Sequence, residues 1–368
     1  MKTRIRTISF YDRFACDGAD CPQTCCGGWR IPVDEASAAR YRKEGGLLGV
    51  RARLALSRGE QPSFSRLAFH CPMQDPDGLC SLQKKRGEKF LPEVCRIFPR
   101  EWANLGSFVE RTLDLSCIKA ARLFLEAAED PDGGLAFREE TGLWEMPRAG
   151  DNDDPEFLAM LDKKRPEVLK RFLNGSIDTP QKLDDAVFAI ADDAKHMQNS
   201  FLRTDEGGMH RIRLFPFSIM LMNELMSTCF YEDHLRYTAR GLYRACRGYY
   251  RTFDRMTEIE GQKKLDALTE RFFAADGPVP LSAFVRYFAY CLIRSWFDSY
   301  EDYSFVRRIV EAAIHTNMLL LFELLAMDRG EKLDIPARAS LIASYEKRAF
   351  HNSDAMDEMV KQVNARFV

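Results

Sequence analysis

The sequence predicts a mainly α-helical protein: a loop-rich, cysteine-cluster metal-binding subdomain followed by a helical, bundle-like domain. Eight of the eleven cysteines lie within the first 117 residues, among many turn-forming residues. From Ser116 onward the chain instead shows one helix start after another. We therefore expect a cysteine-rich metal-binding domain over residues 1–129, a linker or exposed loop over 130–155 and a helical domain over 156–368.

Few regular elements are expected in the first part. Asp34 precedes the run EASAARYRKE and predicts an N-capped helix that stops at Gly45-Gly46. Further on, the segments 95–99 and 108–115 flank the turn sequence Asn104-Leu105-Gly106-Ser107, and the second alternates in polarity. This pattern predicts a short β-hairpin.

The helical part begins with Ser116 as the cap of the run IKAARLFLEAAE, followed by the turn-rich and acidic segment 130–155. Pro155 opens the next helix, and Thr179-Pro180 opens one with a single apolar stripe. The members of that stripe are Leu183, Val187, Ile190, Ala194, Met197 and Phe201. Ser282 opens a further helix, and residues 303–327 predict a mostly buried helix closed by Gly330.

Composition excludes several classes of protein. The net charge of −2 argues against a general nucleic-acid binder, which needs a basic surplus. Charge is uneven, because residues 1–120 carry 20 Lys and Arg against 14 Asp and Glu, whereas the remainder carries 33 against 41. The first 14 residues lack the pattern of a signal peptide, and residues 318–327 are too short an apolar run to span a membrane. We expect a cytoplasmic protein with no membrane or nucleic-acid partner.

The cysteine pattern is the strongest chemical signal. Four cysteines lie within eleven residues, where thiolates repel one another unless a cation or an iron–sulfur core neutralises them. In a reducing compartment such clustering indicates metal more than disulfides. The sequence therefore predicts eight metal ligands: Cys16, Cys21, Cys25, Cys26, Cys71, Cys80, Cys95 and Cys117.

The spacing leaves the metal open between an iron–sulfur cluster, with 4Fe–4S favoured, and zinc. The adjacent pair Cys25-Cys26 favours two centres, or one ligand with a buried neighbour. His70 is a weaker candidate ligand beside Cys71. The other three cysteines, Cys229, Cys246 and Cys291, lie singly in apolar helical patterns and are expected to be buried thiols.

Three stretches of the chain resemble the flagellin lysine-N-methylase family, within a wider group of cysteine-cluster proteins that chelate zinc or iron. They are CDGADCPQTCCGGWRIPVD (16–34), HCPMQDPDGLCSLQKKRGEKFLPEVCRIFPR (70–100) and ERTLDLSCIKAARLFL (110–125). The order of the eight cysteines, together with Trp29, Pro99 and Arg100, carries the resemblance over about the first third. One departure is Ile118, where the family favours proline.

The resemblance implies transfer of a methyl group from S-adenosylmethionine to lysine side chains of flagellin, with a cysteine-bound iron–sulfur cluster taking part. The chain has no GxGxG loop of the kind found in Rossmann-type methyltransferases. It also lacks a CxxxCxxC motif: Cys21 and Cys25 have the spacing of the first two cysteines, but Gly28 stands where the third cysteine would be. No catalytic or cofactor-binding residue is therefore assigned. The alternative is a non-catalytic metal-binding or electron-carrying module on a helical scaffold.

Overall fold

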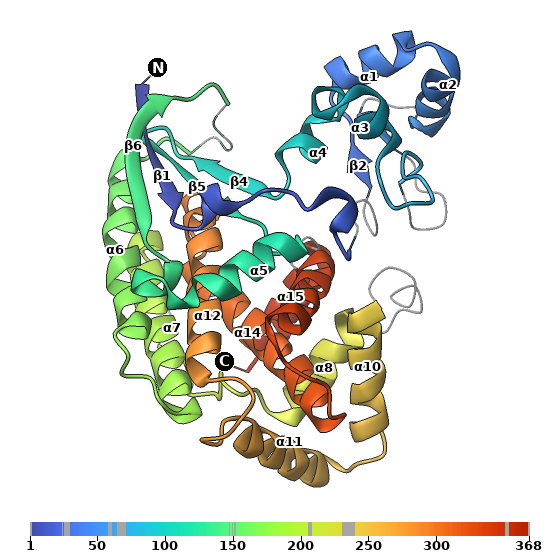
Figure 1. Ribbon diagram of the computed structural model, residues 1–368. Helices are drawn as coiled ribbons and strands as arrows, with labels where there is room; N and C mark the ends of the chain where they lie inside the picture. Colours follow the sequence, from blue (N-terminus) through green and yellow to red (C-terminus); the bar gives the residue numbers. More distant parts are fainter. Residues whose placement is uncertain are drawn as a thin grey trace.

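The structure, a computed structural model, is mainly helical, and its described residues also form a four-stranded and a two-stranded β-sheet. It describes residues 2–23, 25, 30–57, 61–64, 71–146, 148, 150, 152–204, 208–229, 240–349 and 353–366. Figure 1 shows a cysteine-rich lobe, formed by α1 to α4, standing beside a sheet that lies over the helices of the remainder of the chain.

The sheet has four strands in the order β4-β5-β1-β6. Its strands are β1 (Lys2–Ile8), β4 (Arg100–Asn104), β5 (Phe108–Leu113) and β6 (Phe137–Leu143). The inner pair β1 and β5 is parallel, with Ile5 opposite Val109, whereas β6 and β4 pair antiparallel at the two edges. The N-terminal strand therefore lies inside the sheet, between strands that come about a hundred or more residues later.

The cysteine-rich lobe has its own small core. Its elements are β2 (Ile31–Pro32), α1 (Glu35–Lys43), α2 (Gly46–Ala55), β3 (Ser63–Phe64), α3 (Ser81–Arg86) and α4 (Glu93–Ile97). The fully buried ring of Tyr41 stacks on Phe64 with centroids 5.7 Å apart, and its hydroxyl donates to the carbonyl oxygen of Phe90 at 2.7 Å. These contacts join three segments of the lobe around one aromatic centre.

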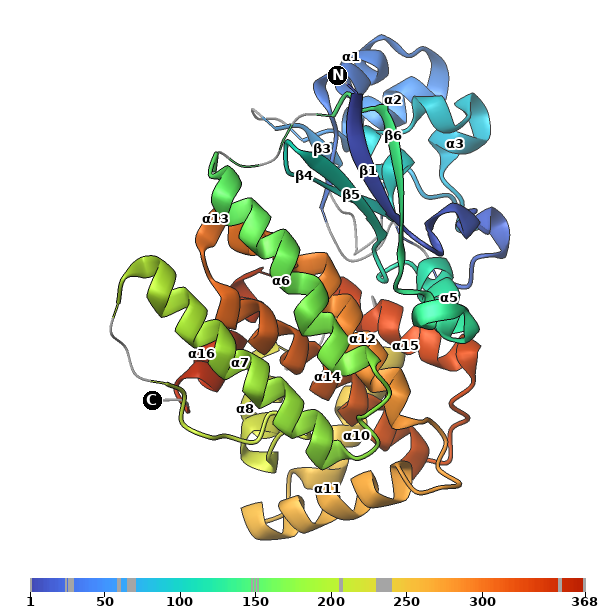
Figure 2. The same ribbon diagram turned by 90° about the vertical axis from the view of Figure 1, so that its left-hand side faces the viewer.

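The other helices share a second, larger core with the sheet. They are α5 (Ile118–Glu126), α6 (Pro155–Leu173), α7 (Pro180–Leu202), α8 (Ile219–Cys229), α10 (Arg240–Phe253), α11 (Glu258–Phe272), α12 (Leu281–Ser295), α13 (Ser299–Asp302), α14 (Phe305–Asp328), α15 (Ile335–Ala349) and α16 (Ser353–Asn364). Helix α14 packs against α7, α10, α11, α12, α15 and α16 and is the axis of this part. Figure 2 shows α6 and α7 in front of α12 and α14, with the sheet above them.

The apolar character of α14 has a packing explanation. By length and composition this helix could cross a membrane, but its most apolar window is entirely buried inside the protein. Every residue from Arg308 to Ala326 is buried. Helix α14 is thus the core helix that the sequence predicts, and Gly330 follows it with a φ of +72°.

Several predicted helix starts are confirmed. Asp34 caps α1 by accepting a hydrogen bond from the Ser37 backbone at 2.8 Å. Thr179 caps α7 in the same way, and Pro155 is the first residue of α6. The predicted stripe of α7 is buried from Leu183 to Ala194 but not at its end, where Phe201 is 39% exposed.

Other expectations were wrong in detail. The hairpin exists, but its first arm is β4, because residues 93–97 form the helical turn α4 instead. Cys117, not Ser116, is the N-cap residue of α5. Residues 137–143, expected within a linker or loop, form β6, because their backbone completes the edge of β1.

Candidate functional site

The predicted cysteine ligands belong to several distinct segments of the fold. Cys16 and Cys21 flank a short 3₁₀ turn, and Cys95 lies inside α4. Cys80 and Cys117 are the N-cap residues of α3 and α5. Figure 1 shows these two helices in different parts of the molecule, α3 in the lobe and α5 against α15.

Four thiols interact electrostatically around Cys95. Burial raises the pKa of the Cys95 thiol, and the neighbouring Cys25, Cys71 and Cys80 raise it further. Burial also raises the pKa of Cys71 to about 11, with Cys80 and Cys25 adding to the shift. Because these charge effects act only over short distances, the fold brings together cysteines that lie up to 70 residues apart.

Three further thiols, those of Cys16, Cys21 and Cys117, interact with one another or with Cys25. Burial raises the pKa of Cys117 to about 12, with Cys21 and Cys25 as additional causes. Burial likewise raises the pKa of Cys21, to which Cys25 and Cys16 contribute. Cys25 is therefore common to both sets of thiols.

Backbone donors surround the two cysteines at helix starts. Amides of Leu82 and Gln83 act on Cys80, and amides of Lys119 and Ala120 act on Cys117, in each case lowering the thiol pKa against the effect of burial. Free N–H groups in the first turn of a helix stabilise an anion. In both cysteines, however, burial outweighs these donors, and the pKa of the thiol remains raised.

The N-terminal cysteine loop is attached to the helical part. The Gln23 side-chain amide donates to the hydroxyl of Ser340 at 2.6 Å and to that of Ser344 at 3.3 Å, both on α15. An ion pair of 2.9 Å joins Asp17 to Lys119 on α5. The thiols around Cys21 therefore lie where this loop meets α5 and α15.

Within the described ranges, no three His, Cys, Asp or Glu side chains are close enough together to hold one metal ion. Two of the residues considered as ligands, Cys26 and His70, lie outside those ranges. The metal centre therefore stays a prediction. Cys246 and Cys291 are buried at 3% and 2% exposure, as expected for structural thiols, whereas the side chain of Cys229 is not among those described.

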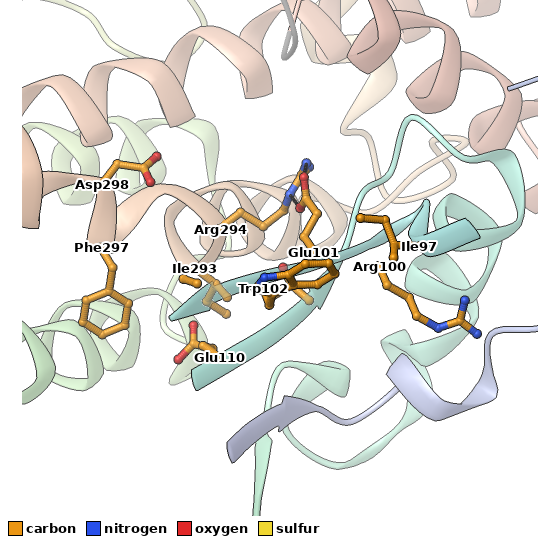
Figure 3. Close-up of a pocket in the computed structure, with 11 residues that line it drawn as sticks. Ile97, Arg100, Glu101, Trp102, Glu110, Ile293, Arg294, Phe297 and Asp298 are labelled. Atoms are coloured by element: carbon orange, nitrogen blue, oxygen red, sulfur yellow. Dashed lines mark hydrogen bonds and ion pairs between the residues drawn. The ribbon is translucent and has the colours of Figure 1, made fainter. Parts of the chain in front are cut away.

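A cavity of about 390 Å³ lies between the β4–β5 hairpin and the end of α12. Its size is within the range of small-molecule sites. Figure 3 shows Phe297 and Asp298 at one end and Ile97 and Arg100 at the other. Its lining comprises Ile97, Arg100, Glu101, Trp102, Ala103, Glu110, Thr112, Ile293, Arg294, Phe297 and Asp298. Since Ile97 and Cys95 share α4, the cavity adjoins the cysteine-bearing helix.

The guanidinium of Arg294, in the middle of the cavity lining, is held in place by three carboxylates. Its guanidinium bonds to Glu101 at 2.9 Å, to Glu346 at 2.6 Å and to Asp114 at 3.4 Å. The Arg294 side chain is 2% exposed and that of Glu346 is fully buried. One positive charge thus joins the sheet, α12 and α15 through three carboxylates.

The carboxylate of Glu110 forms an ion pair with a different arginine, Arg165. Arg165 of α6 donates to both of its carboxylate oxygens, at 2.5 and 2.6 Å, and both side chains are buried. This two-fold hydrogen bonding fixes the position of the carboxylate and balances its charge. Glu110 is therefore a rigid part of the cavity wall.

Asp298 differs from the other two carboxylates of the lining. It ends the 3₁₀ turn Trp296–Asp298, and among the described residues no hydrogen bond or ion pair is made by its side chain. Asp298 is an exposed residue, yet the protein atoms around its carboxyl raise its pKa to about 6 against the opposing effect of Arg308. A carboxylate with such a pKa is suited to accept a proton near neutral pH.

Apart from Arg100, which carries part of the family resemblance, no residue of this cavity was expected from the sequence to belong to a site. Arg294 was one signal that the sequence offered for this site. It stands within a largely apolar helical run, and a buried charge needs partners of opposite charge. Its partners lie at positions 101, 114 and 346, which no local pattern links.

Comparison with curated proteins relates the chain to a small set of relatives. It is 29% identical over 141 residues to the Lysine-N-methylase of Salmonella typhimurium and 28% identical over 141 residues to that of Salmonella choleraesuis. Each match covers 36% of this chain and 34% of the relative, so the chain matches about a third of their length.

A third relative is the Flagellar biosynthetic protein FliU of Salmonella muenchen, 28% identical over 132 residues, which are 34% of this chain and 76% of that protein. No protein-family model matches the chain, and no solved structure matches it. The chain is thus distantly similar to proteins named for lysine methylation and for flagellar biosynthesis.

Proposed function

We propose that this protein is a cytoplasmic S-adenosylmethionine-dependent protein-lysine N-methyltransferase that acts on flagellin. The observation that carries the proposal is the similarity to two proteins named Lysine-N-methylase. The name FliU of the third relative supports a flagellar substrate. S-adenosylmethionine supplies a methyl group when bound, and no residue of this chain is assigned to it.

The proposal includes a cysteine-bound metal centre. The donor chemistry fits, because zinc and iron–sulfur clusters both take sets of thiolates. Cys25, Cys71, Cys80 and Cys95 are one candidate set, because these thiols act on one another electrostatically; in the described residues no three of them yet lie close enough to hold one ion, so metal binding requires them to move together. Interactions of the same kind support a second set made of Cys16, Cys21 and Cys117, to which Cys26 is the fourth candidate by sequence.

Incubating anaerobically purified protein with methyl-labelled S-adenosylmethionine and flagellin tests the reaction. We expect label on flagellin lysines and none on flagellin whose lysines have been acetylated. Cys95→Ser should reduce both metal content and labelling, whereas Cys246→Ala, at a buried thiol outside both sets, should leave the metal content unchanged. If lysines of flagellin stay unlabelled, the proposed reaction is wrong.

The rival function is a non-catalytic metal-binding or electron-carrying module. The separate core of the lobe is the observation that favours it, because a lobe with its own core can act as a module. A protein that carries metal but labels no lysine would support this rival. Broad visible absorbance would indicate iron–sulfur, and a colourless protein with stoichiometric zinc would indicate a zinc centre.

A further inference from the structure

Negative charge predominates around the cavity. Arg294 is shared among three carboxylates, those of Glu101, Asp114 and Glu346. Burial raises the pKa of Glu346, but Glu101 and Asp114 are enough to balance the charge of Arg294 when they are ionised. Arg165 balances Glu110, but Asp298 has no such partner within the described part of the chain. A cavity of this charge attracts a cation.

The charged groups that face Asp298 come from three other elements. They are Arg308 and Glu311 on α14, Asp302 on α13 and Glu101 on β4. The positive one, Arg308, is itself bonded to Glu311 at 2.9 Å and to Asp302. Arg308 lowers the pKa of Asp298, whereas Glu311, Asp302 and Glu101 raise it, so the three carboxylates act against the one guanidinium.

Aromatic rings complete the lining. Trp102 lies in the middle of the cavity beside Glu101 and Arg294 (Figure 3), and its ring meets Trp144 edge-on at 5.9 Å between centroids. Phe297, next to Asp298, is buried at 5% exposure. Aromatic faces together with carboxylates bind alkylammonium groups, because the ring quadrupole attracts the charge while the ring covers the alkyl chain.

We propose that this cavity receives the side chain of the target lysine, with Asp298 as the group that accepts its proton. The inference rests on the proposed function and assigns it a substrate site. Arg100, at the other end, points its guanidinium over the ring of Phe14 at 5.0 Å and not toward Asp298, so it does not oppose an incoming ammonium group there.

The proton transfer balances simply. An N–H bond of the lysine ammonium breaks, and an O–H bond forms on the Asp298 carboxylate. The nitrogen keeps the lone pair of the broken bond, and this lone pair is what must attack the methyl group. Burial of the ammonium beside Trp102 and Phe297 lowers its pKa and assists the transfer, whereas the carboxylates of Glu101 and Asp298 raise that pKa and oppose it. Because the pKa of Asp298 is about 6, its carboxylate is a stronger base than an ordinary aspartate and is still ionised at neutral pH.

The first test measures binding alone, on the full-length wild-type protein. The probe is n-butylammonium, and the signal is the indole ¹⁵N–¹H resonance of Trp102, assigned with Trp102→Phe. We expect a saturable shift with n-butylammonium and none with the neutral 1-pentanol. The affinity should fall as the pH is lowered through about 6, where Asp298 becomes protonated. A Trp102 resonance that does not respond, or an affinity without this pH dependence, contradicts the proposal.

The second test uses matched variants. Asp298→Asn should bind n-butylammonium about tenfold more weakly, since one charge contact is lost. Asp276→Asn, the same change at an exposed residue outside the cavity, should bind as the wild type does. Equal binding by Asp298→Asn and the wild type would overturn the assignment. If Asp298→Asn does not fold, the pH dependence of n-butylammonium binding to the wild-type protein tests the assignment of Asp298 instead.

Methylation assays separate this inference from the proposed function. If the protein methylates flagellin, kcat for Asp298→Asn should fall about 100-fold, and the rise of kcat/KM with pH near 6 should disappear. Methylation with an unaffected Asp298→Asn variant would refute the inference and leave the function intact. Binding of n-butylammonium without any methylation would refute the function and leave the cation site intact.

Discussion

At the scale of single residues, the interior charges decide much of the stability. Arg294 is almost fully buried and balances carboxylates from β4, α15 and the segment after β5. Tyr287 also donates its hydroxyl to Glu346 at 3.0 Å. A buried charge network of this kind tolerates the loss of one partner poorly, because the remaining charges stay away from water.

We therefore predict that Arg294→Met destabilises the fold by about 3–5 kcal/mol, as measured by urea denaturation. The fully buried Glu346 would lose its only basic partner among the described residues. The control is Arg271→Met, which removes an ion pair with Asp328 from a side chain that is 57% exposed. That change should cost less than about 1 kcal/mol, and equal losses in the two variants would contradict the prediction.

The cysteines show what sequence can and cannot predict about a site. Their number and spacing predicted a metal cluster, and this stays a prediction: Cys25, Cys71 and Cys80 act electrostatically on Cys95, but within the described part of the chain no three such side chains lie close enough to hold one ion. The cavity was not predictable in this way. Its lining comes from α4, β4, β5 and the end of α12, and only the pairing of distant strands and helices brings these faces together.

At the scale of elements, local signals predicted helices better than strands. Asp34, Thr179 and Pro155 each mark a helix start by a mechanism contained within a few residues. Strand β1 has no such signal, because its identity depends on pairing with β5 and β6. Strand β6 was likewise expected to be a loop. Its residues are mostly exposed, so they show no pattern of a buried strand, and only their backbone pairing with β1 makes them a strand.

Asp34 links two elements of the cysteine-rich lobe. One carboxylate oxygen accepts from the Ser37 backbone at 2.8 Å, and the other accepts from the Glu93 backbone, at the start of α4, at 2.9 Å. Burial raises the pKa of this carboxyl, but the hydrogen bonds from Glu93 and Ser37 outweigh that effect and lower the pKa below its usual value.

We predict that Asp34→Ala costs about 1–2 kcal/mol of stability at neutral pH, as measured by chemical denaturation. Because the folded-state pKa is lowered, the stabilisation is present above the unfolded-state pKa of about 3.9 and is lost as the pH falls through the folded-state pKa. The difference between wild type and Asp34→Ala should therefore shrink in acid. Asp34→Asn keeps an acceptor for one backbone N–H and should lose less, with no pH-dependent part; a difference that grows in acid would refute this account.

At the scale of the whole molecule, the described residues form two hydrophobic cores, and the larger one includes residues from both ends of the segment 1–129. The small core lies within the lobe, between Ile31 and Leu91. The large core contains Ile8 and Phe10 from the N-terminus and Phe108 and Leu113 from β5, together with the helices. Residues at both ends of the segment 1–129 thus depend on the helical part.

We predict that a fragment of residues 1–129 does not form the sheet by itself, because it lacks β6 and the helices that cover the large core. Its ¹H–¹⁵N NMR spectrum should show dispersed signals at most from residues of the lobe. Adding a fragment of residues 130–368 should restore the dispersed signals of β1 and β5. A monomeric fragment 1–129 with a complete set of dispersed signals would instead support an independent domain that ends at residue 129.

The position of β1 also matters while the chain is being made. Lys2–Ile8 are synthesised well before their pairing partners, because the parallel partner begins at Phe108 and the antiparallel partner at Phe137. Until those residues emerge, the nascent chain carries a strand with two open edges, which can pair with other chains. The speed of translation between β1 and β6, and access of a chaperone to the unpaired β1, should therefore govern how much of this protein reaches its folded state.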